Sequence, residues 1–175
     1  MKKFAVLGFV LLIFCVSAFA QKTKTTAKAD PSKAVRETFD RLIEGIEQSD
    51  ADKVMSVYEK SDKILFFNNN GSATIGWDNM KKTRDSLYAK TKNVDLEITG
   101  LRVEMLGAGN AYLTCKWKQS QEYDGKLETA SGRMTVVFKQ IGKDWKAVHL
   151  HTSPDNPPPA RPVFPSERDS GVNVN

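Results

Sequence analysis

The second half of the chain alternates apolar and polar residues over several long stretches, and this feature limits the possible folds more than any other. Leu96 and Ile98 set one phase of the alternation, which is reversed after Gly100. A period of two is typical of strands with one buried face, and glycine at the change of phase indicates a bulge. Three further strands are expected, over residues 111–123, 128–140 and 145–153.

The first half has the helical period instead. Asp30 and Pro31 are typical of a helix start. The apolar stripe that follows consists of Val35, Phe39, Leu42, Ile43 and Ile46. Two later stripes, Val54-Met55-Tyr58 and Met80-Arg84-Leu87-Thr91, predict two more helices, with a short strand over 64–67 between them.

Helices followed by long antiparallel strands predict an α+β domain with the helices on one face of a curved sheet. A bent sheet with helices across it encloses a cone-shaped hollow. Hollows of this kind are where small ligands bind.

The ends of the chain are expected to lie outside this domain. Residues 1–20 combine a pair of lysines, an apolar run and small residues before Gln21, as in a cleavable signal peptide. The run is too short to span a bilayer, which needs about 20 apolar residues. We therefore expect export to the periplasm or the extracellular space, with no membrane anchor after cleavage. Residues 21–31 are predicted to be a flexible leader, 32–154 the domain, and 155–175 a Pro-rich disordered tail.

Composition argues against several classes of partner. The chain carries a net charge of +5, but Lys and Arg equal Asp and Glu in number between residues 30 and 156. A nucleic-acid-binding domain concentrates basic residues on its folded surface, so no nucleic acid is expected. After cleavage Cys115 would be the remaining cysteine, which excludes an internal disulfide. No cofactor is predicted.

His149 and His151 are the two histidines of the chain. Two apart on a predicted strand, they share a face with Trp145 and Ala147, so we expect both to face the hollow. There they could bind a ligand, act as acid or base, or offer two ligands to a metal, although no third ligand is evident. The alternative is a structural pair, with one ring hydrogen-bonded inside and the other at a subunit contact.

Arg133 and three aromatic residues complete the predicted ligand-binding set. Arg133 begins the strand expected beside the last one, and its guanidinium could bind an anionic group if it faces the hollow. A surface position or a salt bridge is the alternative. Tyr58, Phe67 and Trp117 are candidates for the core or for the walls of the hollow. Cys115, on the same apolar face as Trp117, is expected to be a buried thiol.

The end of the domain carries the most telling pattern. Ser131-Gly132-Arg133 opens one strand, and Gly142 to Ser153 follows Gly-x-x-Trp-x-x-Val-His-x-His-x-Ser. This resembles SnoaL-like domains of the nuclear transport factor 2-like superfamily, and also the association domain of calcium/calmodulin-dependent kinase II. The resemblance covers about residues 33–153. It implies a cone-shaped fold, with N-terminal helices on a curved, mainly antiparallel sheet, and a homodimer formed through the outer sheet face.

The superfamily includes ketosteroid isomerases, which the resemblance allows us to test. Those enzymes place a catalytic Asp at the end of the short strand after the second helix, and use a Tyr and an Asp as an oxyanion hole. Here Asn68 and Asn69 follow the strand, and Phe39 stands near the place of the Tyr. Because Asn cannot act as a general base, isomerase chemistry of that kind is not predicted.

Three functions remain, because a fold does not choose among them. The favoured one is an exported domain that binds a small molecule in its hollow without catalysis. The second is a lyase, cyclase or isomerase that uses His149 or His151 as acid or base. The third is an oligomeric scaffold.

Overall fold

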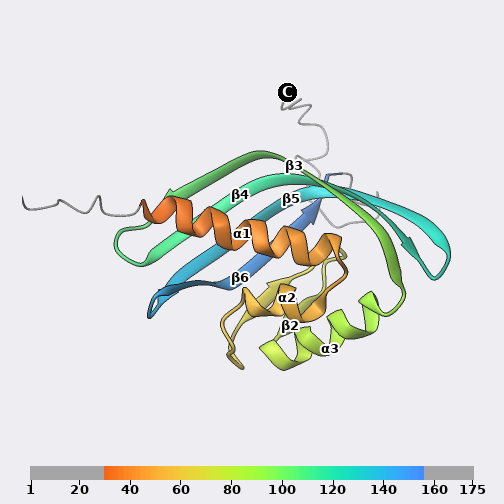
Figure 1. Cartoon of the computed structure of the whole chain (residues 1–175), viewed down its shortest axis with the longest axis horizontal. Coiled ribbons are helices and arrows are strands. Elements are labelled where there is room, and N and C mark those ends of the chain that lie inside the picture. The colour runs from red at the N-terminus through yellow and green to blue at the C-terminus, as the bar shows by residue number, and fades with distance from the viewer. Residues whose placement is uncertain (1–29, 156–175) are drawn as a thin grey trace, which may run out of the picture.

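The computed structural model of the chain describes residues 30–155. The predicted signal peptide, most of the predicted leader and the predicted tail from residue 156 lie outside the described residues. Within 30–155, three helices accompany a six-stranded sheet (Figure 1). No helix in this range is both long enough and apolar enough to cross a membrane.

The helices begin where their sequences predict. α1 (Pro31–Glu47) starts after Asp30, whose carboxylate accepts a backbone hydrogen bond at 2.9 Å. α2 (Ala51–Ser56) starts in the same way after Asp50, also at 2.9 Å. α3 spans Trp77–Tyr88. The buried face of α1 is the predicted apolar stripe, with Val35, Phe39, Leu42 and Ile46 buried and Ile43 half-buried.

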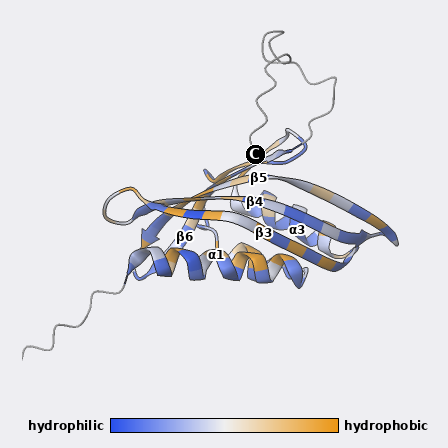
Figure 2. Cartoon of the chain, turned by 90° about the horizontal axis from the view of Figure 1, so that it is seen from above, coloured by the Kyte–Doolittle hydropathy of each residue, from blue (hydrophilic) through white to orange (hydrophobic). Residues whose placement is uncertain are grey.

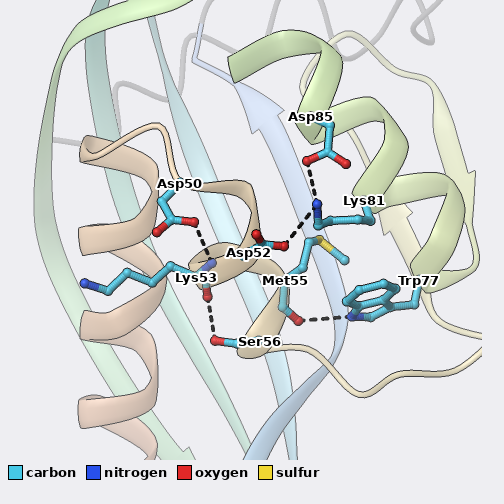
Figure 3. A network of polar contacts seen from close by, with 8 residues as sticks. All are labelled: Asp50, Asp52, Lys53, Met55, Ser56, Trp77, Lys81 and Asp85. Carbon is cyan, nitrogen blue, oxygen red and sulfur yellow. Dashed lines mark hydrogen bonds and ion pairs between the residues drawn. The ribbon is translucent and has the colours of Figure 1, made fainter. Parts of the chain in front are cut away.

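α3 is fixed to α2 by a hydrogen bond and an ion-pair network (Figure 3). Trp77 Nε1 donates to the Met55 carbonyl at 3.0 Å. Lys81 Nζ pairs with Asp52 at 3.1 Å and with Asp85 on its own helix. Hydrogen bonds to Asp85 and then to Asp52 raise the pKa of Lys81, so the ammonium keeps its charge in the neutral range. This network sets the position of the first two turns of α3 against α2.

The six strands follow the order β2-β1-β6-β5-β4-β3, and neighbours are antiparallel except for β1 and β6. They are β1 (Leu65–Phe67), β2 (Ala73–Ile75), β3 (Thr91–Met105), β4 (Asn110–Tyr123), β5 (Lys126–Ile141) and β6 (Asp144–Pro154). The bulge predicted at Gly100 is confirmed, with φ of 60°. β3 begins at Thr91 instead of Val94, so assigning Thr91 to the third helix was wrong. β2 was not predicted, because three residues show no period.

A second bulge, in β6, was also not predicted. Val137 pairs with His149 while Phe138 pairs with Ala147, so Val148 is an extra residue opposite β5. One inserted residue reverses the face that every later side chain of the strand occupies. The C-terminal part of β6 therefore has the opposite phase to the one expected from its sequence.

The sheet is bowed, and α1 lies along one side of it (Figure 2). Residues of α1 and α3 line one cavity together with residues of the sheet. We call the side toward the helices the inner face and the opposite side the outer face. Phe39 of α1 packs into the same core as Leu113 and Phe138 from the inner face, and all three are nearly inaccessible to solvent. Each such side chain contributes about 1.5–3 kcal/mol to folding through its burial.

Candidate ligand-binding site

A cavity of about 520 Å³ lies between the helices and the inner face of the sheet. Its apolar wall comes from Leu42 and Ile46 of α1 and from Leu96, Met134 and Leu150 of the sheet. The volume falls within the range of roughly 300–1,000 Å³ that is usual for ligand pockets. The hollow expected from a bent sheet with helices across it is therefore present and not filled by side chains.

Unpartnered polar atoms gather around this cavity. Within residues 30–155, four buried side-chain nitrogen or oxygen atoms have no hydrogen-bond partner, and all four belong to residues that line it. They are Asn69 Oδ1, Arg84 Nε, Tyr88 OH and Trp117 Nε1. Each such atom costs about 1–3 kcal/mol, and native proteins contain few of them. All four belong to side chains that line the cavity, so a bound molecule is one source of the partners that they lack.

Arg84 brings a positive charge to the wall. Its guanidinium carbon lies 5.7 Å from the centre of the Tyr88 ring, one helical turn further along α3. The Arg84 side chain is half-buried, and none of the ion pairs found among residues 30–155 includes it. The charge is therefore available to a bound molecule.

Apart from Arg84, the ionisable side chains of the inner wall stay uncharged or do not reach the cavity. Burial raises the pKa of Tyr88, and the nearby Arg84 guanidinium opposes this shift, although no hydrogen bond of acceptable geometry joins the two side chains. Burial raises the pKa of Tyr58 as well. Both phenols are therefore neutral at pH 7. Burial also raises the pKa of Cys115 to about 11; this thiol is buried, as predicted, and does not line the cavity. Among the lining residues that the structure describes there is no histidine.

The rim of the cavity is polar. Asn68 and Asn69, which follow β1, line it where the isomerases place a catalytic carboxylate. On the β4–β5 hairpin, Gln119 Nε2 donates to Gln121 Oε1 at 2.7 Å, and Gln121 Nε2 donates to Glu128 at 3.3 Å. Glu128 is exposed, so its carboxylate belongs to the rim and not to the inner wall.

Two of the predicted site residues lie in the cavity wall. Trp117 and Tyr58 both line it and are 9% and 4% exposed. Tyr58 also packs edge-on against Phe66, with ring centres 4.9 Å apart. Tyr58 and Trp117 therefore belong both to the core and to the cavity wall.

The predicted position of the two histidines was wrong. Because of the bulge at Val148, Leu150 points into the cavity, and His149 and His151 lie on the outer face. His149 Nδ1 is 2.9 Å from the Leu65 carbonyl, and His151 is exposed. The hydrogen bond of His149 fits one half of the structural pair described as the alternative, while a subunit contact for His151 stays a prediction. No metal-binding group of three or more His, Cys, Asp or Glu occurs within residues 30–155.

Phe67 and Arg133 accompany the histidines instead of the cavity. The Phe67 ring is 41% exposed, and its centre lies 5.6 Å from each imidazole centre in an edge-on arrangement. Arg133 is exposed and opposite in phase to Met134, which lines the cavity. The pocket position considered for Arg133 was therefore wrong. Whether any of these outer-face residues binds a ligand stays a prediction.

Sequence reasoning missed Asn69, Arg84 and Tyr88. The signal for Arg84 was present, because it is a cation within the apolar stripe Met80-Arg84-Leu87. A charged residue at such a position faces either a partner or a polar cavity. Tyr88 and Asn69 gave no comparable signal, since Tyr88 is the last residue of α3 and Asn69 lies in the loop after β1.

Solved structures with the same architecture define the class of fold. A candidate dehydratase of the NTF2-like family from Streptomyces avermitilis has a TM-score of 0.66 at 18% identity, over 73% of this chain and 97% of that one. A nuclear transport factor 2-like superfamily protein from Salmonella enterica has 0.66 at 17%, over 75% and 96%. A candidate calcium/calmodulin dependent protein kinase II association domain from Xanthomonas campestris has 0.61 at 16%, over 74% and 90%. The chain thus has the nuclear transport factor 2-like fold, as predicted.

The family follows from the sequence itself. The family model of the SnoaL-like domain matches residues 35–157, and the chain belongs to this family. Among curated proteins no sequence match was found. At these identities the solved structures show a shared fold and not a shared activity.

Proposed function

We propose that this SnoaL-like domain binds a small organic molecule in the cavity between its helices and its sheet, and that it catalyses no reaction there. The single observation that carries the proposal is the gathering of four unpartnered polar atoms around one largely apolar cavity. A few polar groups in an apolar pocket are the usual composition of a ligand site, in which they fix the ligand's orientation.

The wall is better suited to binding than to catalysis. A general acid or base works best with a pKa near the working pH. The phenols of Tyr58 and Tyr88 have raised pKa values, and both histidines lie on the outer face. An enzyme that uses His149 or His151 on a molecule in this cavity is therefore disfavoured. A scaffold with a vestigial hollow is disfavoured by the open volume.

Native mass spectrometry of the purified protein tests the proposal. We expect a bound small molecule that is released on denaturation. The variant Met134→Trp should obstruct the cavity and remove most of this extra mass, while Met134→Leu, which leaves the cavity open, should keep it. Extra mass that persists in a folded Met134→Trp variant would place the ligand elsewhere. A ligand-free protein that binds nothing from a metabolite library would refute the proposal.

We also propose a homodimer formed through the outer face. Phe67 and Ile75 are 41% and 59% exposed there, on neighbouring strands, and large exposed apolar side chains grouped together often mark interfaces. The same patch on both subunits would give a two-fold symmetric contact. Light scattering should give a dimer mass for the protein and for Leu106→Lys, an exposed change in the β3–β4 turn, but a monomer mass for Phe67→Lys. A monomer at micromolar concentration in the unchanged protein would refute the dimer.

Finally, we propose that residues 1–20 direct export and are then removed. The support is the sequence pattern of these residues, which lie outside the described part of the chain. The intact mass of the exported protein should correspond to a chain that begins at Gln21. A full-length mass, or retention in the cytoplasm, would refute export.

A further inference from the structure

We infer that the ligand of the cavity is an organic anion, with an apolar body and one carboxylate or sulfonate group that Arg84 binds. This inference rests on the proposed function and adds the chemical class of the ligand. It follows from three properties of the wall: the kind of unpartnered atoms, the unpaired charge, and the apolar surface around them.

The unpartnered atoms are mostly donors. Arg84 Nε and Trp117 Nε1 can only donate a hydrogen bond, and Tyr88 OH can donate one. Only Asn69 Oδ1 must accept. A group that satisfies several donors needs several lone pairs, and an ionised carboxylate offers about four. A single hydroxyl group offers two and would leave donors unpaired.

The positive charge of Arg84 also indicates an anionic ligand. Arg84 takes part in none of the ion pairs among residues 30–155, and the carboxylate of Glu128 at the rim accepts a hydrogen bond from Gln121 instead. Covering a half-buried guanidinium with a neutral molecule would remove water from the charge without replacing it. A carboxylate or sulfonate supplies the counter-charge, and the planar guanidinium can meet its oxygens with two parallel hydrogen bonds.

The apolar wall excludes a small inorganic anion as the matching ligand. Leu42, Ile46, Leu96 and Leu150 present hydrocarbon to the cavity, and a phosphate or sulfate ion would leave that surface in contact with water. An apolar body attached to the anionic group would cover it. The two parts of the ligand thus correspond to two parts of the wall.

A pair of fluorescent probes separates the anion from the apolar body. 8-Anilino-1-naphthalenesulfonate and N-phenyl-1-naphthylamine share one aromatic skeleton and differ in the sulfonate. Titration of the ligand-free protein should show the sulfonate binding at least tenfold more tightly than the amine. In Arg84→Met, or in Arg84→Gln if the first variant does not fold, this preference should fall to within about twofold, because a charge-assisted bond is lost. Lys82→Met, an exposed change on the same helix, should keep the preference.

The outcomes distinguish the two proposals. Equal binding of the two probes, or a sulfonate preference that survives the loss of Arg84, overturns the organic-anion inference and leaves ligand binding standing. Binding of both probes with unchanged affinity to a folded Met134→Trp variant shows that they sit outside the cavity and overturns the inference as well. If neither probe binds the folded, unchanged protein, the inference fails and the proposed function loses its support.

Discussion

Replacing Tyr88 with Phe should stabilise the ligand-free protein, although the same change usually destabilises a buried tyrosine. The Tyr88 side chain is 9% exposed, and its hydroxyl has no hydrogen-bond partner. Removing a hydrogen-bonded hydroxyl typically costs about 1 kcal/mol, whereas a buried unpartnered one costs about 1–3 kcal/mol to keep. Since Phe fills the same space, the variant should gain about 1 kcal/mol in free energy of unfolding, at the lower end of that range because the site can relax.

Urea unfolding at pH 7 measures this difference directly, on protein refolded from denaturant so that any bound molecule is removed. Trp77→Phe is the matched control, because Trp77 Nε1 has a partner in the Met55 carbonyl at 3.0 Å. It should lose about 1 kcal/mol, since the hydrogen bond from the indole nitrogen is lost, although the Met55 carbonyl keeps one from the Tyr58 backbone N–H. The two aromatic changes should therefore have opposite signs.

The pH dependence of stability provides a second test of the Tyr88 hydroxyl. Because burial raises the pKa of Tyr88, the unfolded phenol ionises near pH 10 while the folded one keeps its proton. The unfolded chain then binds fewer protons, so stability falls as pH rises above about 10. Tyr88→Phe should lessen this alkaline loss. A variant that is less stable by 1 kcal/mol or more at pH 7, with an unchanged alkaline slope, would show that the hydroxyl is paired and would refute the reasoning.

Three further predictions concern packing, titration and docking. Gly132→Ala should lower the free energy of unfolding by about 1–3 kcal/mol in urea, because its Cβ would lie 2.2 Å from the Ser153 carbonyl oxygen; a neutral effect would show that β5 and β6 can separate. Tyr58→Phe should reduce the loss of stability above pH 10, because burial also raises the pKa of this phenol. The reduction is about 1.4 kcal/mol per pH unit at most. Thermal melts at alkaline pH should show it, and an unchanged slope of stability against pH would contradict the prediction. Lys81→Met should change the free energy of unfolding by less than about 1 kcal/mol, since surface ion pairs contribute little. Backbone amides of α3 should nevertheless exchange faster, because the helix is held less firmly against α2. Unchanged exchange would argue against a role of Lys81 in holding the two helices together.

The elements of the fold were predictable because their periods are long. α1 shows its stripe over four turns, and the phase change at Gly100 is marked by a glycine. The bulge at Val148 has no such mark, because a β-branched residue is ordinary in a strand. The only sign of this bulge in the sequence is that the buried apolar positions change from odd numbers, Trp145 and Ala147, to an even number, Leu150. Three positions are too few to distinguish such a change from chance.

The site was less predictable than the fold for a related reason. Its polar residues come from α3, the loop after β1 and β4, and only the tertiary structure brings Asn69, Arg84 and Trp117 to one cavity. The histidines were predicted to form the site because imidazole has versatile chemistry, but their orientation depends on the unpredicted bulge at Val148. Residue type alone could not supply that orientation.

The extra residue at Val148 has a consequence for how such a domain could change its chemistry. If β6 were regular, with Val148 paired opposite Val137, both imidazoles would face inward, and Leu150 and Thr152 would face outward. A binding chamber would then acquire proton-transfer groups through the loss of one bulge, with every residue of the strand retained. In a scaffold of this shape, the chemistry available to a chamber depends on the register of one strand as much as on the amino acids that the strand contains.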